Sequence, residues 1–318
     1  MNQASPSVSV VVPTRNRAAR LRGLVAALEQ QTLPAEKFEL VVVDDGSTDD
    51  TATVLKSVSV TQFAVTALTG SGAGPAAARN AGWQRARAPI IAFTDDDCEP
   101  TPAWLELGLA AARANAGAFV QGPTSPLPRE RSRLGPFSRT KSIAALGPWY
   151  QTCNIFYPRE LLVRLGGFDE RFTRPFGEDA DLAWRALDAG ARAVFATPAL
   201  VHHAVEDLGV RDYLRTALRD PDEARLFKLH PGLRSQVAHW RIFKSKSHAY
   251  LALALAGVAL AGQRPAAIVL TTPYARFLIA RSRAPGARLT DIPLFIAYDA
   301  LEGYAATHGA LRHRVFAL

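Results

Sequence analysis

Residues 38–51, "FELVVVDDGSTDDT", decide the fold class of this chain. The stretch begins with six almost continuously apolar residues, as in a β-strand that is covered on both faces of a sheet. Two aspartates end the strand, Gly46 permits a tight turn, and Ser47 or Asp49 can cap a following helix. The stretch therefore predicts a strand, a turn and a helix, which together form the repeating unit of an α/β protein.

The same alternation continues on both sides of this stretch. Short apolar and β-branched runs predict further strands at residues 8–13, 60–68 and 89–95. Helical patterns lie between the strands, at about residues 18–30, 49–57 and 75–87. This alternation implies a mostly parallel central sheet that is flanked by helices.

A chain of 318 residues is long for one domain, so we expect one large domain with an appendage. Beyond about residue 209 the pattern changes to helices, and we place an α/β domain at 1–208 and a helical, basic region at 209–318. Residues 225–318 hold 13 Lys and Arg, but their acidic residues are only Asp291, Asp299 and Glu302. The basic region therefore suggests an anionic surface as its neighbour.

The composition also bears on compartment and partners. Two cysteines form neither a disulfide framework nor a zinc-finger spacing, which favours a reducing environment. The first residues lack the basic and apolar segments of a secretory signal, so we expect a cytoplasmic protein. No helix-turn-helix, zinc finger or RNA-binding aromatic signature accompanies the net charge of +8, so we expect no nucleic-acid partner.

Polar segments follow three of the expected strands. They are "PTRNR" after the first strand, "DDGSTDD" after the second and "TDDDCEP" after the fourth. In open α/β sheets, ligands bind in the crevice beyond the carboxyl ends of the strands. We therefore expect a ligand site where these three segments meet.

Three consecutive aspartates stand in the last of these segments. Strand geometry would point Asp95 and Asp97 to one side of the sheet and Asp96 to the other. Adjacent carboxylates repel one another unless a cation or hydrogen-bond donors compensate their charge. A solvated turn is the alternative, but an Asp-x-Asp pair can share one hard divalent cation, so the segment is a candidate metal site.

With these segments in view, the chain resembles glycosyltransferase family 2, the inverting, nucleotide-sugar-dependent enzymes of the GT-A fold. The resemblance covers roughly residues 7–205, and it depends on the order of several segments that are each weak alone. The matching segments are "VSVVVPTRNR", "ELVVVDDGSTDDT", "GPAAARNAGWQRARAPIIAFTDDDCEPTPAWLE", "GGFDERF" and "GEDADLAWRALDAG".

The resemblance implies a pocket for a nucleotide diphosphate sugar, with Asp44 as the best candidate for contact with the base or the ribose. It implies further donor contacts from Pro13, Thr14, Arg15, Asp45, Arg79, Asn80, Asp95 and Asp96.

The resemblance also implies a metal site, in which Asp95 and Asp97 hold Mn²⁺ or Mg²⁺ against the diphosphate of the donor. In some family members a histidine near the last strand completes this site, and imidazole suits such cations. Successive strand residues point to opposite sides, so only one of the adjacent histidines can face the site, and we favour His202 over His203.

Glu178 and Asp179 match the family's Glu-Asp motif, in which the aspartate is the usual base for the acceptor hydroxyl. Acidic residues in a first helical turn also complement the helix dipole without any catalytic role. The context of the other segments favours the catalytic interpretation.

These segments together predict a metal-dependent, inverting glycosyltransferase. The "QxxRW" motif of processive members is missing, which favours single transfer to a saccharide or lipid-linked acceptor, with a role in cell-envelope glycan synthesis. Transfer onto a polyprenyl phosphate and a catalytically silent sugar-nucleotide-binding protein are the alternatives. A dinucleotide-dependent oxidoreductase is disfavoured, because Pro75 stands where the GxGxxG fingerprint needs its third glycine.

Two apolar segments follow in the basic region, at residues 249–262 and 265–280. The first would span about 21 Å as a helix, which is short of the roughly 30 Å hydrocarbon core of a bilayer. Basic residues flank both segments, as in helices that lie in a membrane interface. We expect peripheral contact with the inner face of the cell membrane, while packing on the α/β domain or in a homodimer stays open. The flanking residues are Lys244, Lys246, Arg281, Arg283 and Arg288.

Overall fold

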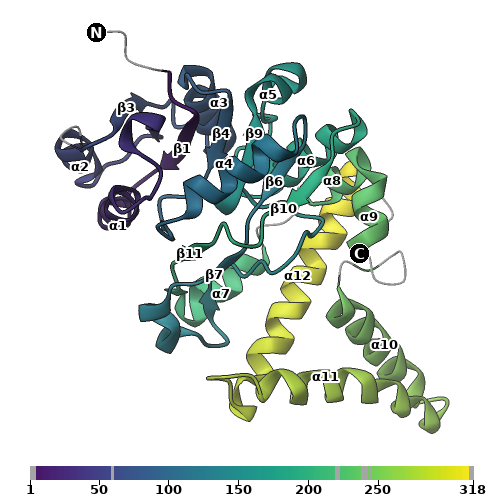
Figure 1. Ribbon diagram of the computed structural model, residues 1–318. Coiled ribbons are helices and arrows are strands. Elements are labelled where there is room, and N and C mark those ends of the chain that lie inside the picture. The colour runs from purple at the N-terminus through teal and green to yellow at the C-terminus, as the bar shows by residue number, and fades with distance from the viewer. Residues whose placement is uncertain (1–4, 59–60, 219–222, 238–242, 244, 315–318) are drawn as a thin grey trace. The chain divides into compact units, whose positions relative to one another are not determined.

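The structure is a computed structural model that describes residues 5–58, 61–218, 223–237, 243 and 245–314 (Figure 1). The chain divides into two compact units. Unit 1 comprises Met1–Glu130 and Thr140–Ala204, and unit 2 comprises Arg131–Arg139 and Val205–Leu318. The assignment of catalysis to residues 1–208 and of membrane contact to residues 209–318 stays a prediction.

Unit 1 is built on a seven-stranded sheet of order β10-β6-β9-β4-β1-β2-β3. Its neighbouring strands are parallel, except that β9 runs antiparallel to both β4 and β6. The predicted mostly parallel α/β sheet is therefore confirmed. The strands are β1 (Val8–Thr14), β2 (Phe38–Asp44), β3 (Ala64–Thr69), β4 (Ile90–Phe93), β6 (Phe119–Gln121), β9 (Ile155–Pro158) and β10 (Ala193–Phe195).

Helices cover both faces of this sheet, which explains why its central strands are continuously apolar. On one face Val10 and Val12 of β1 belong to a core with α1, α2 and α4. On the other face Val11 belongs to a core with α3, α5 and α6. The helices are α1 (Ala18–Glu29), α2 (Thr51–Val58), α3 (Pro75–Arg85), α4 (Trp104–Ala114), α5 (Arg159–Leu165) and α6 (Glu178–Asp188), with short 3₁₀ turns η1 (Ala35–Lys37), η2 (Pro128–Arg133) and η3 (Thr152–Asn154).

A small second sheet continues the chain beyond β4. It contains β5 (Cys98–Pro100), β11 (Val201–His203) and β7 (Thr124–Pro126), in the order β5-β11-β7. Strand β11 runs antiparallel to β5 and places His203 opposite Cys98. The end of β11 is thereby brought beside the turn that joins β4 to β5.

Unit 2 is mainly helical. Its core gathers Ala254, Tyr274, Leu278 and Phe295. The helix expected over residues 265–280 is divided into η4 and α11, with Pro273 in the first turn of α11. The elements are β8 (Ser138–Arg139), β12 (Glu206–Asp207), α7 (Gly209–Ala217), α8 (Glu223–Leu229), α9 (Pro231–Val237), α10 (Lys246–Ala261), η4 (Pro265–Thr271), α11 (Thr272–Ser282), η5 (Leu289–Asp291) and α12 (Ile292–His313).

A buried polar network joins α11 to α12 within this unit. Asp299, which is 1% exposed, accepts a hydrogen bond from the hydroxyl of Tyr274 at 2.9 Å and pairs with Arg281 at 3.1 Å. In the part of the chain that the structure describes, no helix combines the length and hydropathy that crossing a membrane requires.

Candidate active site

The carboxyl edge of the large sheet is organised by contacts between the loops that follow β1 and β2. Asn16, which has a positive φ of 54°, donates its backbone N–H to the hydroxyl of Ser47 at 2.8 Å. Its side-chain oxygen accepts the backbone N–H of Thr48 at 2.7 Å. Asp44 accepts the backbone N–H of Ser47 at 2.9 Å, and its side chain is only half-buried. These contacts join the two loops and place Asp44 at the end of β2, at the carboxyl edge of the sheet.

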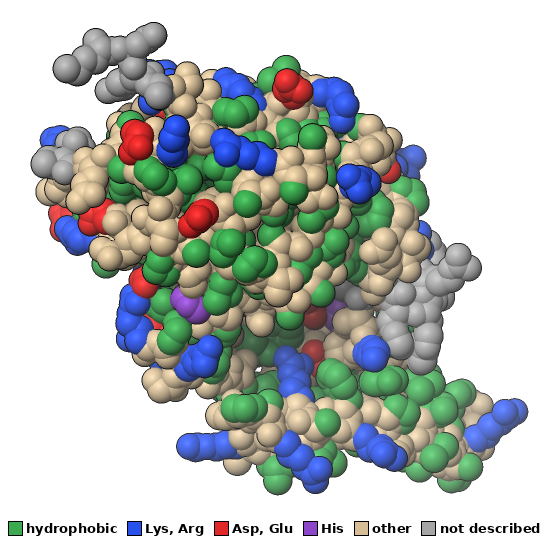
Figure 2. All heavy atoms as spheres, in the orientation of Figure 1, with side chains coloured by type: hydrophobic (Ala, Val, Ile, Leu, Met, Phe, Trp, Pro, Cys, Tyr) green, Lys and Arg blue, Asp and Glu red, His purple; other side chains and the backbone are tan. Residues whose placement is uncertain are grey.

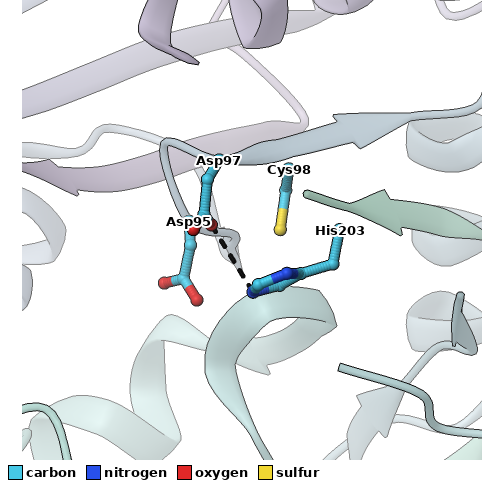
Figure 3. A group of neighbouring side chains, drawn as sticks. All are labelled: Asp95, Asp97, Cys98 and His203. Carbon is cyan, nitrogen blue, oxygen red and sulfur yellow. Dashed lines mark ion pairs between the residues drawn. The ribbon is translucent and has the colours of Figure 1, made fainter. Parts of the chain in front are cut away.

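The three aspartates after β4 lie in a turn rather than in a strand. The turn is closed by a hydrogen bond from the backbone N–H of Cys98 to the carbonyl of Asp95 at 3.1 Å. It still separates the side chains as predicted, since Asp95 and Asp97 belong to one cluster (Figure 3). Asp96 is buried and lies outside this cluster. One ligand atom from each of Asp95, Asp97, Cys98 and His203 lies within 4.8 Å of the others.

Asp96 is 7% exposed and accepts a hydrogen bond from the Thr14 hydroxyl at 2.7 Å. Burial and the neighbouring Asp97 raise the pKa of Asp96 to about 7. Asp96 and Thr14, both expected to contact the donor, therefore fasten the aspartate turn to the end of β1.

The possible metal ligands at this turn fit a divalent cation. Two carboxylates and one imidazole are ligands that Mn²⁺ accepts readily, whereas burial raises the pKa of the Cys98 thiol and keeps it protonated. A cationic group already stands at the cluster, because an Arg17 guanidinium nitrogen lies 2.9 Å from Asp97 Oδ2. The residues thus fit a bound metal ion, with Arg17 balancing the acidic charge of the chain itself.

The histidine at this cluster is His203, not the predicted His202. His203 Nε2 lies 3.5 Å from Asp97 Oδ1, whereas His202 Nδ1 lies 3.0 Å from the hydroxyl of Ser125 on β7. The two side chains do point oppositely, as expected of a strand. The pairing of β11 with β5 decides which of them faces Asp97, and this register could not be derived from the local sequence.

Arg79 connects the cluster around Asp95 and Asp97 to the start of α6. It is 4% exposed and lies 2.9 Å from Asp95, 2.9 Å from Glu178 and 3.8 Å from Asp179. Burial disfavours its charge, but these three carboxylates hold the pKa of Arg79 above its usual value. Burial and Asp179 raise the pKa of Glu178, which is 2% exposed, although Arg79 opposes this rise.

Asp179 is more accessible, with a side chain that is 21% exposed. Its two carboxylate oxygens accept hydrogen bonds from the backbone N–H and the hydroxyl of Thr152, each at 3.0 Å. Thr152, in η3, was not among the predicted site residues, and no motif in the sequence marks it. The carboxylate is thus held in one orientation while part of it stays open to solvent.

Two other residues that were predicted to contact the donor make hydrogen bonds within the chain. Asp45 accepts the backbone N–H groups of Gly72 and Gly74 at 2.8 and 2.9 Å, and so fixes the loop before α3. Asn80 exchanges hydrogen bonds with the backbone of Phe168 and with the side chains of Trp83 and Glu170. Of the remaining predicted positions, Pro13 lies half-buried near the end of β1, and Arg15 follows it with an exposed side chain.

The mostly parallel sheet flanked by helices is that of the GT-A fold. The mannosyltransferase PcManGT from Pyrobaculum calidifontis, solved in complex with GDP-Man and Mn²⁺, shares this fold with a TM-score of 0.56 and 22% identity, over 98% of this chain and 88% of that chain. Residues 9–166 match the family model described as Glycosyl transferase family 2. The chain belongs to this family.

Curated relatives agree with this assignment. Validoxylamine A glucosyltransferase of Streptomyces hygroscopicus subsp. jinggangensis is 34% identical over 215 residues, which cover 57% of this chain and 51% of the relative. Glycosyltransferase AglE of Haloferax volcanii is 29% identical over 216 residues, which cover 66% of this chain and 70% of the relative. The chain spans about half the length of the validoxylamine A glucosyltransferases that it matches.

Proposed function

We propose that this protein transfers a sugar from a nucleotide diphosphate sugar to an acceptor hydroxyl, in a single metal-dependent step that inverts the anomeric centre. One observation carries the proposal, namely that the buried Arg79 contacts both parts of the site. Arg79 pairs with Asp95, which lies in the cluster with Asp97 and His203. It also contacts Asp179, which Thr152 holds in place. A cluster that fits a divalent cation and a candidate base therefore lie at one edge of the sheet.

The cation would be Mn²⁺ or Mg²⁺, held by Asp95, Asp97 and His203. When bound, such an ion neutralises the charge that develops on the departing nucleoside diphosphate. Arg17 pairs with Asp97, one of the carboxylates of the proposed cation site. Asp44 would contact the base or the ribose, with Pro13, Thr14 and Arg15 beside it.

Asp179 would remove the proton from the acceptor hydroxyl as that oxygen attacks the sugar. An alcohol is a poor nucleophile until its proton is removed, and a positioned carboxylate supplies about 10²–10⁴-fold of rate enhancement. The two hydrogen bonds from Thr152 orient the carboxylate. Glu178 is buried against Arg79 and would position that guanidinium rather than contact the acceptor.

The acceptor is proposed to be a saccharide or a lipid-linked saccharide of the cell envelope, met by a cytoplasmic protein at the inner face of the membrane. The basic character of residues 225–318 supports an acceptor that is carried by an anionic membrane. Transfer onto a polyprenyl phosphate is the alternative, and it would need Asp179 less because that acceptor is already an anion. The assembled acidic cluster and candidate base count against a catalytically silent binding protein.

Thermal unfolding with nucleoside diphosphates tests the proposal. A ligand that binds only the folded protein raises its stability by mass action, so UDP, GDP, dTDP and CDP are each added with and without Mn²⁺, with NAD as the control. We expect a metal-dependent shift with one diphosphate. No shift with any of them, or a metal-independent shift with NAD, would contradict the proposal.

The base is tested by Asp179→Asn. This variant should keep the metal-dependent shift with the nucleotide and lose transfer by about 10²–10⁴-fold, because donor binding needs the cluster but not the base. Undiminished transfer would remove Asp179 from this role and favour an anionic acceptor.

A further inference from the structure

Unit 2 exposes several large apolar side chains on the hairpin formed by α10 and η4. Side chains of this size are normally buried, and a group of them exposed on one hairpin indicates an interaction surface. We call this group the apolar ridge. Its members and their exposed fractions are Leu255 (61%), Val258 (60%), Leu260 (46%), Ile268 (53%) and Val269 (65%).

The packing of the hairpin explains why these side chains face outward. A Cβ atom on Gly257 of α10 would lie 2.8 Å from the carbonyl oxygen of Ala267 and 2.9 Å from Cβ of Leu270, so the two segments are in close contact there. Ala254, one turn earlier, is buried in the core of unit 2. On this part of α10, Ala254 and Gly257 are therefore buried, while Leu255 and Val258 are exposed.

The segment that carries the ridge bears charge of one sign. No Asp or Glu occurs between residues 225 and 290, whereas exposed basic residues stand before, within and after the hairpin and along α11. Figure 2 shows hydrophobic and basic side chains together over the region of α10 and α11. The exposed basic residues are Lys246, Arg264, Arg276, Arg283 and Arg288.

We propose that the apolar ridge and its basic border dock onto an anionic lipid bilayer and lie in the interface between its headgroups and acyl chains. Apolar side chains at the acyl boundary with Lys and Arg near anionic headgroups are the chemistry of an interfacial helix. The 16 residues of α10 span about 24 Å, so the hairpin lies in the interface and does not cross the bilayer.

The same features argue against other occupants. A second copy of this chain would bring one basic border against another, and the net repulsion opposes a dimer through this surface. Nucleic acid would use the basic residues but would leave the five ridge side chains exposed. An anionic bilayer covers the apolar ridge and compensates the basic border at once.

Co-sedimentation of the full-length protein with vesicles tests the proposal, and no donor or acceptor is added. Vesicles of phosphatidylcholine are compared with vesicles of phosphatidylcholine and phosphatidylglycerol, at low and high salt. We expect binding to the anionic vesicles that weakens with salt. Because transfer is not measured, a failure here would leave the proposed transferase activity standing.

Two sets of variants separate the apolar from the basic contribution. Leu255→Ser and Val269→Ser should each weaken vesicle binding by about tenfold or more. Arg264→Gln and Arg276→Gln should each weaken it by a factor of about five and reduce its salt dependence. Val163→Ser is the matched control, because Val163 is 62% exposed on α5 of unit 1 and should leave vesicle binding unchanged.

Three results would overturn the proposal. The first is an absence of binding to anionic vesicles, and the second is equal binding to neutral and anionic vesicles. The third is a dimer in sedimentation velocity that Leu255→Ser and Val269→Ser abolish, which would make the ridge an interface between copies. Circular dichroism melting of each variant identifies a loss of folding, and the arginine variants test the proposal if a ridge variant is unstable.

Discussion

Replacing Arg79 by Met should destabilise unit 1 by about 3–5 kcal/mol, the cost of removing one partner from a buried ion pair. The Arg79 and Glu178 side chains are 5% and 3% exposed, and their charged atoms lie 2.9 Å apart. The contacts of Arg79 with Asp95 and Asp179 contribute less, because those carboxylates are 27% and 21% exposed and water screens them. The loss therefore comes mainly from the charge of Glu178, which would stay buried without its cation.

The pH dependence of this loss has a definite sign. Burial and Asp179 raise the pKa of Glu178 above its ordinary value of 4.5, and removal of the opposing Arg79 raises it further. A carboxyl group whose pKa is raised by folding costs stability as the pH rises from its unfolded value through its folded value. The Arg79→Met variant should therefore be least stable at alkaline pH, and its deficit relative to the wild type should shrink as the pH falls to where Glu178 is protonated in both proteins.

A second substitution isolates the cause. Glu178→Gln in the Arg79→Met background removes the stranded charge and should recover most of the lost free energy of unfolding. Urea unfolding can be followed by tryptophan fluorescence, and Arg171→Met is the control because the side chain of Arg171 is 74% exposed. Four of the five tryptophans lie in unit 1, namely Trp83, Trp104, Trp149 and Trp184.

Two outcomes would refute this reasoning. One is an Arg79→Met variant that is as stable as the wild type at alkaline pH. The other is a double variant that is no more stable than the single one, which would show that the buried charge of Glu178 is not the source of the loss.

His203→Ala should weaken Mn²⁺ binding about tenfold or more, while His202→Ala should leave it unchanged. Calorimetric titration with Mn²⁺ in the presence of nucleotide measures both affinities. Equal effects would mean that the register of β11 does not decide which histidine binds the metal. Burial raises the pKa of Glu39, but hydrogen bonds from Ser9 and Arg87 lower it overall. Glu39 therefore stabilises the fold above pH 4.5, and this contribution is lost as the pH falls through the folded pKa. Acid titration of the free energy of unfolding should be flatter in Glu39→Gln, and an unchanged slope would contradict this. Gly108→Ala should cost about 1–3 kcal/mol in urea unfolding, because its Cβ would lie 2.1 Å from Cζ of Phe156, and a stabilised variant would show that α4 can shift.

The sheet was predictable where burial on both faces leaves a local mark. β1 and β2 read as apolar runs because helices cover both of their faces. The position of β9 between β4 and β6 was not predictable, because periodicity identifies a strand but not its neighbours. The division of residues 265–280 into η4 and α11 was also missed, although Pro273 stands in the first turn of α11.

The candidate site shows the same limit at the level of side chains. The local spacing of Asp95 and Asp97 was enough to predict that they converge, even though they lie in a turn. Long-range pairings decide that His203, and not His202, faces Asp97. They also bring Thr152 to Asp179 across 27 positions of the chain. Asp45 shows why motif membership does not fix a role, because a carboxylate that accepts backbone N–H groups has the same chemistry as one that accepts a ligand.

The repulsion among the clustered carboxylates is already compensated by arginines of the chain itself. Arg17 lies against Asp97, and Arg79 lies between Asp95 and Glu178. The two arginines are not equivalent, since the side chain of Arg17 is 28% exposed and that of Arg79 is only 5% exposed. An exposed side chain can move at little cost, whereas a buried ion pair is held by its surroundings. A cation that enters the proposed site would therefore displace Arg17 from Asp97, while Arg79 would keep Asp95 beside the start of α6.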